Sequence, residues 1–219
     1  MTPVAPVILE WPTVFDTVDA VERAWLQFVA NYPDEERVRL RQALAFAQAR
    51  HAGQQRRGSD TPYWLHLVRV ALELARWGQA TPELVGAALL HDVVEDTPTT
   101  VAEVAEGFGP KIAELVEWMT APAGRERSAC AIHYERMARF APPEARVLKL
   151  ADRTDNLRSI QALVMRTGDR YRKWARTYLE RTKEDILPLT VDAPSIARVT
   201  LVTAMADLAP MVEGGTPTS

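Results

Sequence analysis

The sequence has a single cysteine, no long apolar run and no excess of positive charge. Cys130 is the one cysteine among 219 residues, which excludes a disulfide within the chain and is typical of a reducing compartment. No apolar run approaches the roughly 20 residues that a membrane helix needs, so we expect no membrane partner. The net charge of −3 carries no basic signature, so we expect no nucleic-acid partner.

Signals for export and for β-structure are also missing. The N-terminal stretch MTPVAPVILEWP has no positive region, and prolines interrupt its apolar residues, so it makes a poor signal peptide. A cytoplasmic protein is therefore expected. No segment shows the two-residue alternation of a strand bounded by hairpin signals. The absence of strand patterns favours an all-α fold.

What the sequence does contain is a series of amphipathic helical patterns. Residues 16–32 place Val21, Trp25 and Phe28 at spacings of three and four, the stripe of a helix that packs on a core. The next pattern, which opens at Asp34, has Val38 among its apolar positions. Similar patterns continue to the C-terminus, so we predict an all-α bundle of about ten helices around one core.

Four ionisable residues interrupt one of the most apolar of these helices. In AALLHDVVEDTPTT, His91 and Asp92 follow directly on buried-type residues, and Glu95 and Asp96 come one helical turn later. Three carboxylates so close together repel one another unless a cation lies among them. An imidazole beside a carboxylate is a typical ligand set for a divalent transition metal. The alternative is a solvated helix end on which the acidic side chains face water.

Two other helices carry polar residues at positions that the apolar pattern assigns to the core. In RVLKLADRTDNLRSI, Asp152 comes directly after buried-type residues, and Asn156 follows one turn later. In PYWLHLVRV, His66 lies among leucines and valines. Considered singly, His66 is explained better as a hydrogen-bonded core histidine than as a metal ligand, and this holds more strongly for His51 and His133.

Taken together, these three segments form the pattern H…HD…D, which resembles the HD superfamily of metal-dependent phosphohydrolases. The wider segments RHAGQQRRGSDTPYWLH, ALLHDVVEDTPTT and VLKLADRTDNLRSI resemble the hydrolase domain of the RelA/SpoT family, which degrades the alarmones ppGpp and pppGpp. The similarity covers roughly residues 34–190. It is greatest to the free-standing small alarmone hydrolases, which lack a synthetase module.

The resemblance implies one divalent metal ion per chain, usually manganese. The residues that match the metal ligands of the family are His66, His91, Asp92 and Asp152. Glu95 and Asp96 match the pair that orients or deprotonates the attacking water. The implied substrate contacts are an arginine of the loop before Tyr63, which is Arg56 or Arg57 according to where the distance is counted from, together with Lys149, Arg153 and Asn156.

The activity implied by the resemblance is removal of the 3′-diphosphate of ppGpp or pppGpp to give GDP or GTP and pyrophosphate. Residues 146–183 contain eleven lysines and arginines against four acidic residues, as an anionic substrate would favour. However, ADRTDNLR replaces the common ADRLHNMR. We expect Thr154 and Asp155 in that segment to affect the choice of substrate. Two alternatives stay open: an HD phosphohydrolase of another nucleotide, such as an NADPH phosphatase or a nucleotidase, and a catalytically silent alarmone-binding module.

The expected domain organisation follows from the extent of the resemblance. We predict an N-terminal extension with one helix at residues 1–33, an HD-type hydrolase core at 34–192, and a C-terminal helix and tail at 193–219. The ends, at 1–13 and 213–219, are expected to be loose. No room for a synthetase module is expected, and the oligomeric state is open.

Overall fold

The structure, a computed structural model, describes residues 17–213 except residues 123 and 125. Within this part of the chain the regular elements are helical and no strand occurs, apart from one isolated bridge between Gln55 and Pro62. The all-α prediction is confirmed. The longer helices are α1 (Val18–Val29), α2 (Asp34–Arg50), α3 (Trp64–Arg76), α4 (Pro82–Leu90), α6 (Val101–Phe108), α7 (Pro110–Met119), α8 (Arg127–Phe140), α9 (Pro143–Thr167), α10 (Arg172–Arg181) and α11 (Ser195–Glu213). The short ones are α5 (Val93–Asp96), η1 (Gly168–Tyr171), η2 (Thr182–Ile186) and η3 (Leu187–Thr190).

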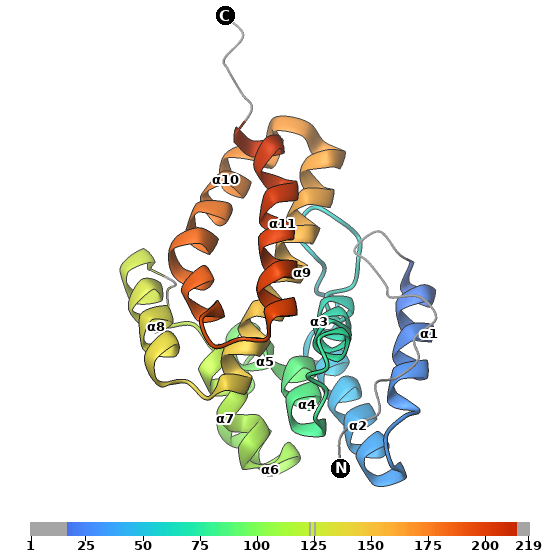
Figure 1. The fold of residues 1–219 in the computed structure, drawn as a ribbon. Coiled ribbons are helices and arrows are strands. Elements are labelled where there is room, and N and C mark those ends of the chain that lie inside the picture. The colour runs from blue at the N-terminus through green and yellow to red at the C-terminus, as the bar shows by residue number, and fades with distance from the viewer. Residues whose placement is uncertain (1–16, 123, 125, 214–219) are drawn as a thin grey trace, which may run out of the picture.

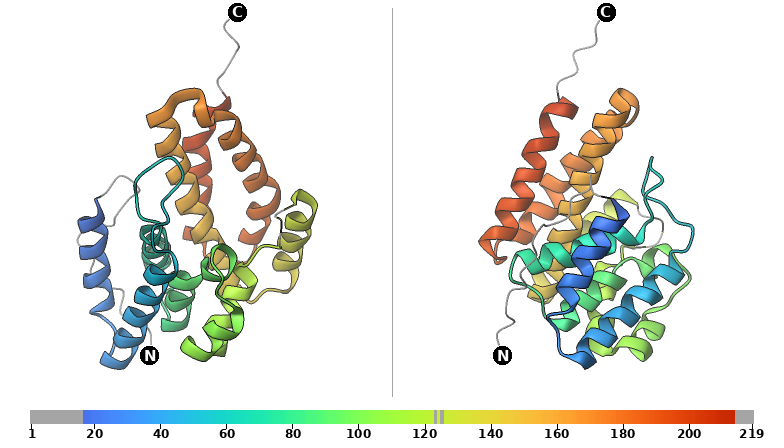
Figure 2. Two further views of the ribbon diagram at one scale, coloured as in Figure 1. Left: turned by 180° about the vertical axis from the view of Figure 1, so that it is seen from behind. Right: turned by 90° about the vertical axis from the view of Figure 1, so that its right-hand side faces the viewer.

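Helix α9 is the central element of the fold. It packs against α3, α4, α7, α10 and α11. Figures 1 and 2 show it running through the molecule, with α1 to α7 at one end and α10 and α11 at the other. Because both halves of α9 are covered, its buried residues contribute to the core and also bring polar side chains to the centre of the molecule.

Capping residues explain where several helices begin. The side chain of Thr81 accepts a hydrogen bond from the backbone N–H of Leu84, and Pro82 occupies the first turn, where its missing N–H is not needed. Thr100 and Glu103 form a reciprocal capping box at the start of α6. These caps fix the ends of the segment that contains the HD pair.

Helix α1 belongs to the same core as the rest of the chain. Its apolar stripe, which includes Trp25 and Phe28, is buried and packs on α3. One hydrophobic cluster extends from α1 to α11. The predicted boundaries at residues 33 and 192 stay predictions. Val38 is 51% exposed, so its assignment to an apolar face is wrong; Leu40 and Leu44 define the buried side of α2, and Val38 points away from it.

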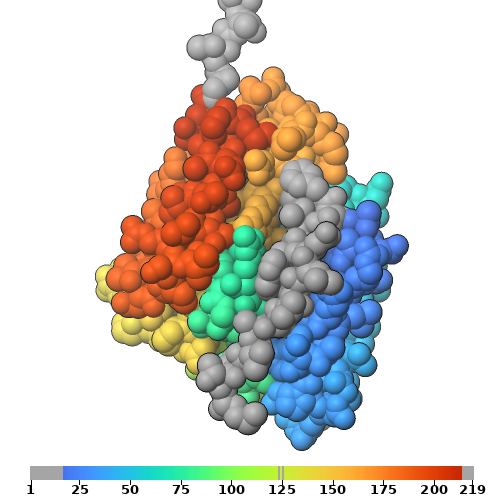
Figure 3. Space-filling model, turned by 45° about the vertical axis from the view of Figure 1, so that its right-hand side comes forward, coloured from blue at the N-terminus to red at the C-terminus, as the bar shows by residue number. Residues whose placement is uncertain are grey.

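Helix α11 is, within the described residues, long and apolar enough to cross a membrane, with 19 residues and a mean hydropathy of 1.3. This is weak evidence, because the core helix of a soluble protein meets the same criteria, and α11 packs on α9 through Leu201 and Leu208. In Figure 3, α11 and α9 form one part of the visible face, and α1 and α2 form another. The predicted loose ends lie outside the described residues, except Glu213, which ends α11.

Candidate metal centre and active site

The HD pair lies at a break between two helices. We expected one continuous helix through His91 and Asp92, but α4 ends at Leu90 and the short helix α5 begins at Val93. Asp92, with φ −101° and ψ −5°, has left the regular helical conformation, which reorients the residues that follow. The His91 side chain is 1% exposed, and its Nδ1 lies 2.8 Å from the backbone carbonyl of Ala88. That contact directs Nε2 away from α4.

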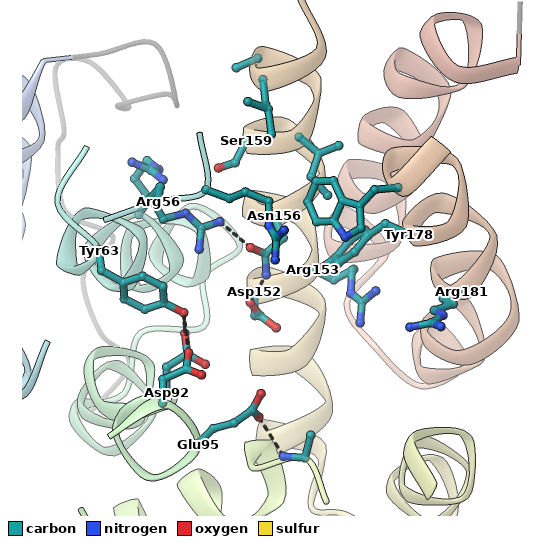
Figure 4. Close-up of a pocket in the computed structure, with 18 of the residues that line it drawn as sticks. Arg56, Tyr63, Asp92, Glu95, Asp152, Arg153, Asn156, Ser159, Tyr178 and Arg181 are labelled. Atoms are coloured by element: carbon teal, nitrogen blue, oxygen red, sulfur yellow. Dashed lines mark hydrogen bonds between the residues drawn. The ribbon is translucent and has the colours of Figure 1, made fainter. Parts of the chain in front are cut away.

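Helices α3 and α9 bring the other two candidate ligands to the same point. His66 Nε2 lies 3.3 Å from Asp152 Oδ1 and 3.7 Å from Asp92 Oδ2. His91 Nε2 lies 3.1 Å from Asp92 Oδ2 and 3.7 Å from Asp152 Oδ1. The two imidazole rings are 5.2 Å apart between centroids. Asp92 and Asp152 face each other across this point in Figure 4. Four side chains from three distant parts of the sequence therefore lie together, where the sequence predicted that they would meet.

The convergent atoms fit a divalent cation. Neighbouring ligand atoms bound at ~2.1 Å are separated by about 3.0 Å in octahedral and about 3.4 Å in tetrahedral geometry. The four separations between an imidazole Nε2 and a carboxylate oxygen range from 3.1 to 3.7 Å. His66, His91 and Asp92 form a group whose ligand atoms all lie within 4.8 Å of one another. Both buried Nε2 atoms lack a hydrogen bond. Buried polar atoms are rarely left without a partner, so a metal ion here accounts for both.

The electrostatics of the cluster show what a cation would replace. Burial alone would lower the pKa of His91, but Asp92 and Asp152 outweigh it and raise that pKa to about 10. Burial would raise the pKa of Asp92, yet the His91 imidazolium lowers it below its usual range. Without a metal, His91 therefore carries the additional proton and faces the two carboxylates as an imidazolium. Binding of a divalent cation must displace that proton, because only neutral imidazole coordinates.

Glu95 and Asp96, the predicted catalytic pair, lie on α5 and point in different directions. The Glu95 carboxylate accepts a hydrogen bond of 2.8 Å from the backbone N–H of Ala121, which holds it at the cavity wall (Figure 4). The Asp96 carboxylate accepts one of 3.1 Å from the hydroxyl of Tyr63. Both carboxylates line the same cavity as the metal cluster. The two acids therefore have separate supports, and their roles can be tested separately.

Tyr63 is a site residue that the sequence interpretation missed. Its hydroxyl, which has a single hydrogen to donate, also lies 2.7 Å from Asp92 Oδ2, so one side chain contacts both the HD pair and the acidic pair. Burial, and next the Asp92 carboxylate, raise the pKa of Tyr63, which keeps the hydroxyl protonated. The His51 ring stacks on the Tyr63 ring at 4.8 Å, and His51 Nδ1 lies 2.8 Å from Gln54. His51 thus has a supporting role in the loop. The signal in the sequence was the tyrosine three residues before His66.

The loop before α3 also supplies the two candidate substrate arginines. Arg56 donates to Asn156 Oδ1 over 2.6 Å, and Asn156 Nδ2 donates to Asp152 Oδ1 over 2.5 Å. This chain of contacts connects the loop to a predicted metal ligand and is visible in Figure 4. The Arg57 guanidinium lies 4.8 Å from the centroid of the Trp174 ring on α10. Arg56 thus lies on the metal side of the cavity, and Arg57 lies against α10.

Lys149 and Arg153 line the cavity but are already engaged. Lys149 Nζ donates to Asp152 Oδ2 over 2.9 Å. Burial alone would lower the pKa of Lys149, but Asp152 together with Tyr134 and Glu95 outweighs burial and raises that pKa, so the amine stays charged. Arg153 donates to Thr182 Oγ1 and lies 4.4 Å from the Tyr178 ring centroid. These contacts place Lys149 beside the metal cluster and Arg153 between α9 and α10.

The exchange at Thr154 and Asp155 reaches the cavity only indirectly, through the contact between Asp155 and Arg69. Neither Thr154 nor Asp155 lines it. Thr154 is fully buried and donates to the Leu150 carbonyl of its own helix. Asp155 Oδ2 lies 2.7 Å from His66 Nδ1, and its carboxylate accepts two hydrogen bonds from Arg69. The expectation that this pair acts on substrate choice stays a prediction; what the structure shows is that Asp155 contacts a candidate metal ligand, His66, and the cavity-lining Arg69. Its spacing of three from Asp152, matched by that of Arg69 from His66, was the signal available in the sequence.

A cavity of about 670 Å³ opens next to the metal cluster. This size is within the usual range for small-molecule sites. Its lining includes eight lysines and arginines and five acidic residues, and four of those five acids surround or adjoin the metal cluster. Away from that cluster the wall includes basic side chains, Trp174, Tyr178 and Leu163. Figure 4 shows Tyr178 near Arg153 and Arg181. Such a cavity suits a polyanion that carries a flat ring.

Comparisons with known proteins agree with this geometry. A profile of the HD-domain family matches residues 43–179. The guanosine-3′,5′-bis(diphosphate) 3′-pyrophosphohydrolase of Aquifex aeolicus (strain VF5) is 37% identical over 137 residues, which is 61% of this chain and 19% of that protein. The bifunctional (p)ppGpp synthase/hydrolase SpoT of Escherichia coli (strain K12) is 38% identical over 161 residues, 70% of this chain and 22% of that protein. The chain thus spans about a fifth of the length of these bacterial relatives.

Smaller relatives match over nearly their whole length. The guanosine-3′,5′-bis(diphosphate) 3′-pyrophosphohydrolase MESH1 of Drosophila melanogaster is 31% identical over 162 residues, 71% of this chain and 89% of that protein. A solved structure of a metazoan ortholog of SpoT that hydrolyzes ppGpp superimposes with a TM-score of 0.64 at 27% identity, covering 80% of this chain and 96% of that one. By the profile match and by the coverage of these relatives, the chain belongs to the HD-domain family.

Proposed function

We propose that this chain is a metal-dependent hydrolase that removes the 3′-diphosphate of the alarmones ppGpp and pppGpp. The observation that carries the proposal is the convergence of His66, His91, Asp92 and Asp152 beside a cavity with a basic, partly aromatic wall. The names of the relatives support this substrate class, since both the small and the large ones are described as 3′-pyrophosphohydrolases of guanosine-3′,5′-bis(diphosphate).

We propose Mn²⁺ as the cation, held by the same four residues. Two carboxylates and two imidazoles form a mixed oxygen and nitrogen set, and carboxylate oxygen suits Mn²⁺ better than it suits softer ions. When bound, the cation supplies Lewis-acid polarisation of a phosphoryl oxygen and lowers the pKa of the attacking water. A cytoplasmic location is proposed with this substrate, and the single cysteine is compatible with it.

The other steps of the proposed hydrolysis are assigned to residues of the chain. The oxygen of a water molecule bonds to the phosphorus next to O3′, the P–O3′ bond breaks, and a proton reaches O3′ to give GDP or GTP and pyrophosphate. Glu95 or Asp96 accepts the proton of the water, since both carboxylates line the cavity beside the metal cluster. Arg56, held 2.6 Å from Asn156 Oδ1, contributes positive charge toward the diphosphate on the metal side.

A direct assay tests the proposal. Purified protein loaded with Mn²⁺ is incubated separately with ppGpp, pppGpp and NADPH, and the products are separated by ion-exchange chromatography. The proposal predicts GDP or GTP with an equal amount of pyrophosphate, and no orthophosphate from NADPH. Intact ppGpp beside hydrolysed NADPH would instead support a phosphatase of another nucleotide. Tight binding of ppGpp without turnover by metal-loaded protein would support a silent alarmone-binding module.

A further inference from the structure

On the Nδ1 side of His66 lies a buried pair of opposite charges that the proposed reaction does not use; of the two residues, Arg69 also lines the cavity and Asp155 does not. Arg69 Nε donates to Asp155 Oδ1 over 2.7 Å, and Arg69 Nη2 donates to Asp155 Oδ2 over 3.0 Å. His66 Nδ1 lies 2.7 Å from the same Oδ2. The exposed fractions of Asp155 and Arg69 are 4% and 6%, and that of His66 is 1%. The three side chains form one hydrogen-bonded unit between α3 and α9.

The Asp155 carboxylate determines which nitrogen of His66 carries hydrogen. A carboxylate held by two guanidinium hydrogen bonds is an acceptor, so His66 Nδ1 is the N–H donor in this contact. Nε2 then presents its lone pair toward Asp152 and Asp92, at 3.3 and 3.7 Å. The second imidazole, His91, reaches the same orientation through the Ala88 carbonyl. One ring is therefore oriented by backbone and the other by a side-chain pair.

We propose that Asp155, fixed by Arg69, is a positioning residue that orients His66 Nε2 toward the divalent cation of the proposed function. Carboxylate partners of this kind hold the ring of a metal-binding histidine and increase its basicity, and their removal typically lowers metal affinity 10- to 100-fold. Position 155 is a histidine in the common ADRLHNMR pattern, and a neutral imidazole cannot accept both guanidinium hydrogen bonds as Asp155 does. Asp155 and Arg69 thus act as a unit.

If the Arg69–Asp155 pair had a purely structural role, it would only hold α3 against α9. The same two helices carry a second pair of this type, in which Arg158 Nη1 donates to Glu73 Oε2 over 2.8 Å. Glu73 is 7% exposed and lies seven residues beyond His66 on α3, about 10 Å along the helix. Glu73→Gln is therefore a matched control, because it weakens an interhelical pair without touching His66.

Two readouts separate positioning from clamping. The first is the Kd for Mn²⁺, measured by isothermal titration calorimetry on the metal-free full chain. The second is the tautomer of His66 in the metal-free protein, read from long-range ¹H–¹⁵N couplings of the imidazole and assigned with His66→Gln among the four histidines. We expect Asp155→Ala to raise the Kd 10- to 100-fold and to convert His66 from one tautomer to a mixture. Asp155→Asn, which can still accept one hydrogen bond, should show a smaller effect.

Glu73→Gln should leave both readouts at their wild-type values, although it lowers thermal stability. Because Asp155→Ala leaves the buried charge of Arg69 unpaired, the double variant Asp155→Leu/Arg69→Leu provides a second test in a chain without that charge. Wild-type Mn²⁺ affinity together with a single wild-type tautomer of His66, in Asp155→Ala or in the double variant, would overturn the inference. The inference rests on the metal site of the proposed function, but the two can fail separately. If the protein binds Mn²⁺ and leaves ppGpp intact, only the proposed function is rejected.

Discussion

The hydroxyl of Tyr63 lies 2.7 Å from Asp92 Oδ2 and 3.1 Å from Asp96 Oδ2. This single donor connects the loop before α3 to the HD pair and to the acidic pair on α5. The loop is held to α5 a second time, since Gln54 Nε2 donates to the Asp96 carbonyl over 3.1 Å. The position of the candidate substrate arginines is thus coupled to that of the metal cluster.

Tyr63→Phe removes this donor while the ring, which stacks on His51, is retained. Asp92 Oδ2 then loses the contact that fixes it, so we expect the Kd for Mn²⁺ to rise about tenfold and turnover of ppGpp to fall. Calorimetry and an initial-rate assay measure the two effects. Tyr32→Phe is the control, because its hydroxyl donates to the Ala80 carbonyl outside the cavity lining. Equal effects of both variants would contradict the assignment.

Glu95→Gln should lower turnover about 10²- to 10⁴-fold, the usual contribution of a general base, without loss of metal. Glutamine can still accept from the Ala121 N–H through its carbonyl oxygen, so the side chain keeps its place. Asp96→Asn, made in parallel, shows which of the two acids takes the proton. Metal content by atomic emission and kcat for ppGpp are measured for both variants. Release of the metal from Glu95→Gln would mean that this carboxylate has a different role.

Arg56 and Arg57 are expected to affect different kinetic constants. Arg56 contacts Asn156, which in turn contacts Asp152, so Arg56→Ala should reduce kcat for ppGpp. Arg57 lies over Trp174, away from the metal cluster, so Arg57→Ala should raise KM and change kcat little. Steady-state kinetics with ppGpp tests both variants. The reverse pattern would exchange the two assignments.

His133 predicts part of the pH dependence of stability. Burial, and next the charge of Lys149, lower its pKa in the folded chain, and the ring lies 3.1 Å from the Trp118 carbonyl through Nε2. As the pH falls below about 6.5, the unfolded state binds a proton on this residue before the folded state does. The contribution of His133 to the free energy of unfolding should therefore decrease from pH 7 to pH 5, opposite in sign to the contribution of His91, whose pKa is raised in the folded chain. In urea titrations, the change in the free energy of unfolding from pH 7 to pH 5 should be less negative in His133→Gln than in the wild type; an unchanged slope would contradict this.

Removal of a predicted metal ligand should abolish metal binding. His91→Ala or Asp152→Ala each deletes one of the four converging groups and leaves three side chains to hold the cation. We expect metal content near zero and hydrolysis of ppGpp reduced to background. Cys130→Ser, a change elsewhere in the cavity lining, should leave one metal ion per chain. A metal-free Cys130→Ser variant would point to a thiolate ligand instead.

Amphipathic periodicity, which is a local pattern, predicted the helical fold, and the resemblance of three separate segments to the HD superfamily predicted the meeting of His66, His91, Asp92 and Asp152. The sequence did not predict that α4 ends before His91, since the break depends on the conformation of Asp92. The roles of Tyr63 and Asp155 depend on contacts between residues 29 and 89 positions apart. Such pairings follow from how α3, α4 and α9 pack, which no pattern within one segment specifies.

The central claim is that one divalent cation binds where α3, α4 and α9 meet. Anomalous diffraction from crystals grown with Mn²⁺ measures this directly, with data on both sides of the manganese edge. The account predicts one anomalous peak per chain, within bonding distance of both imidazole Nε2 atoms and of the Asp92 and Asp152 carboxylates. A peak bonded to other side chains, or no peak in protein that hydrolyses ppGpp, would contradict it.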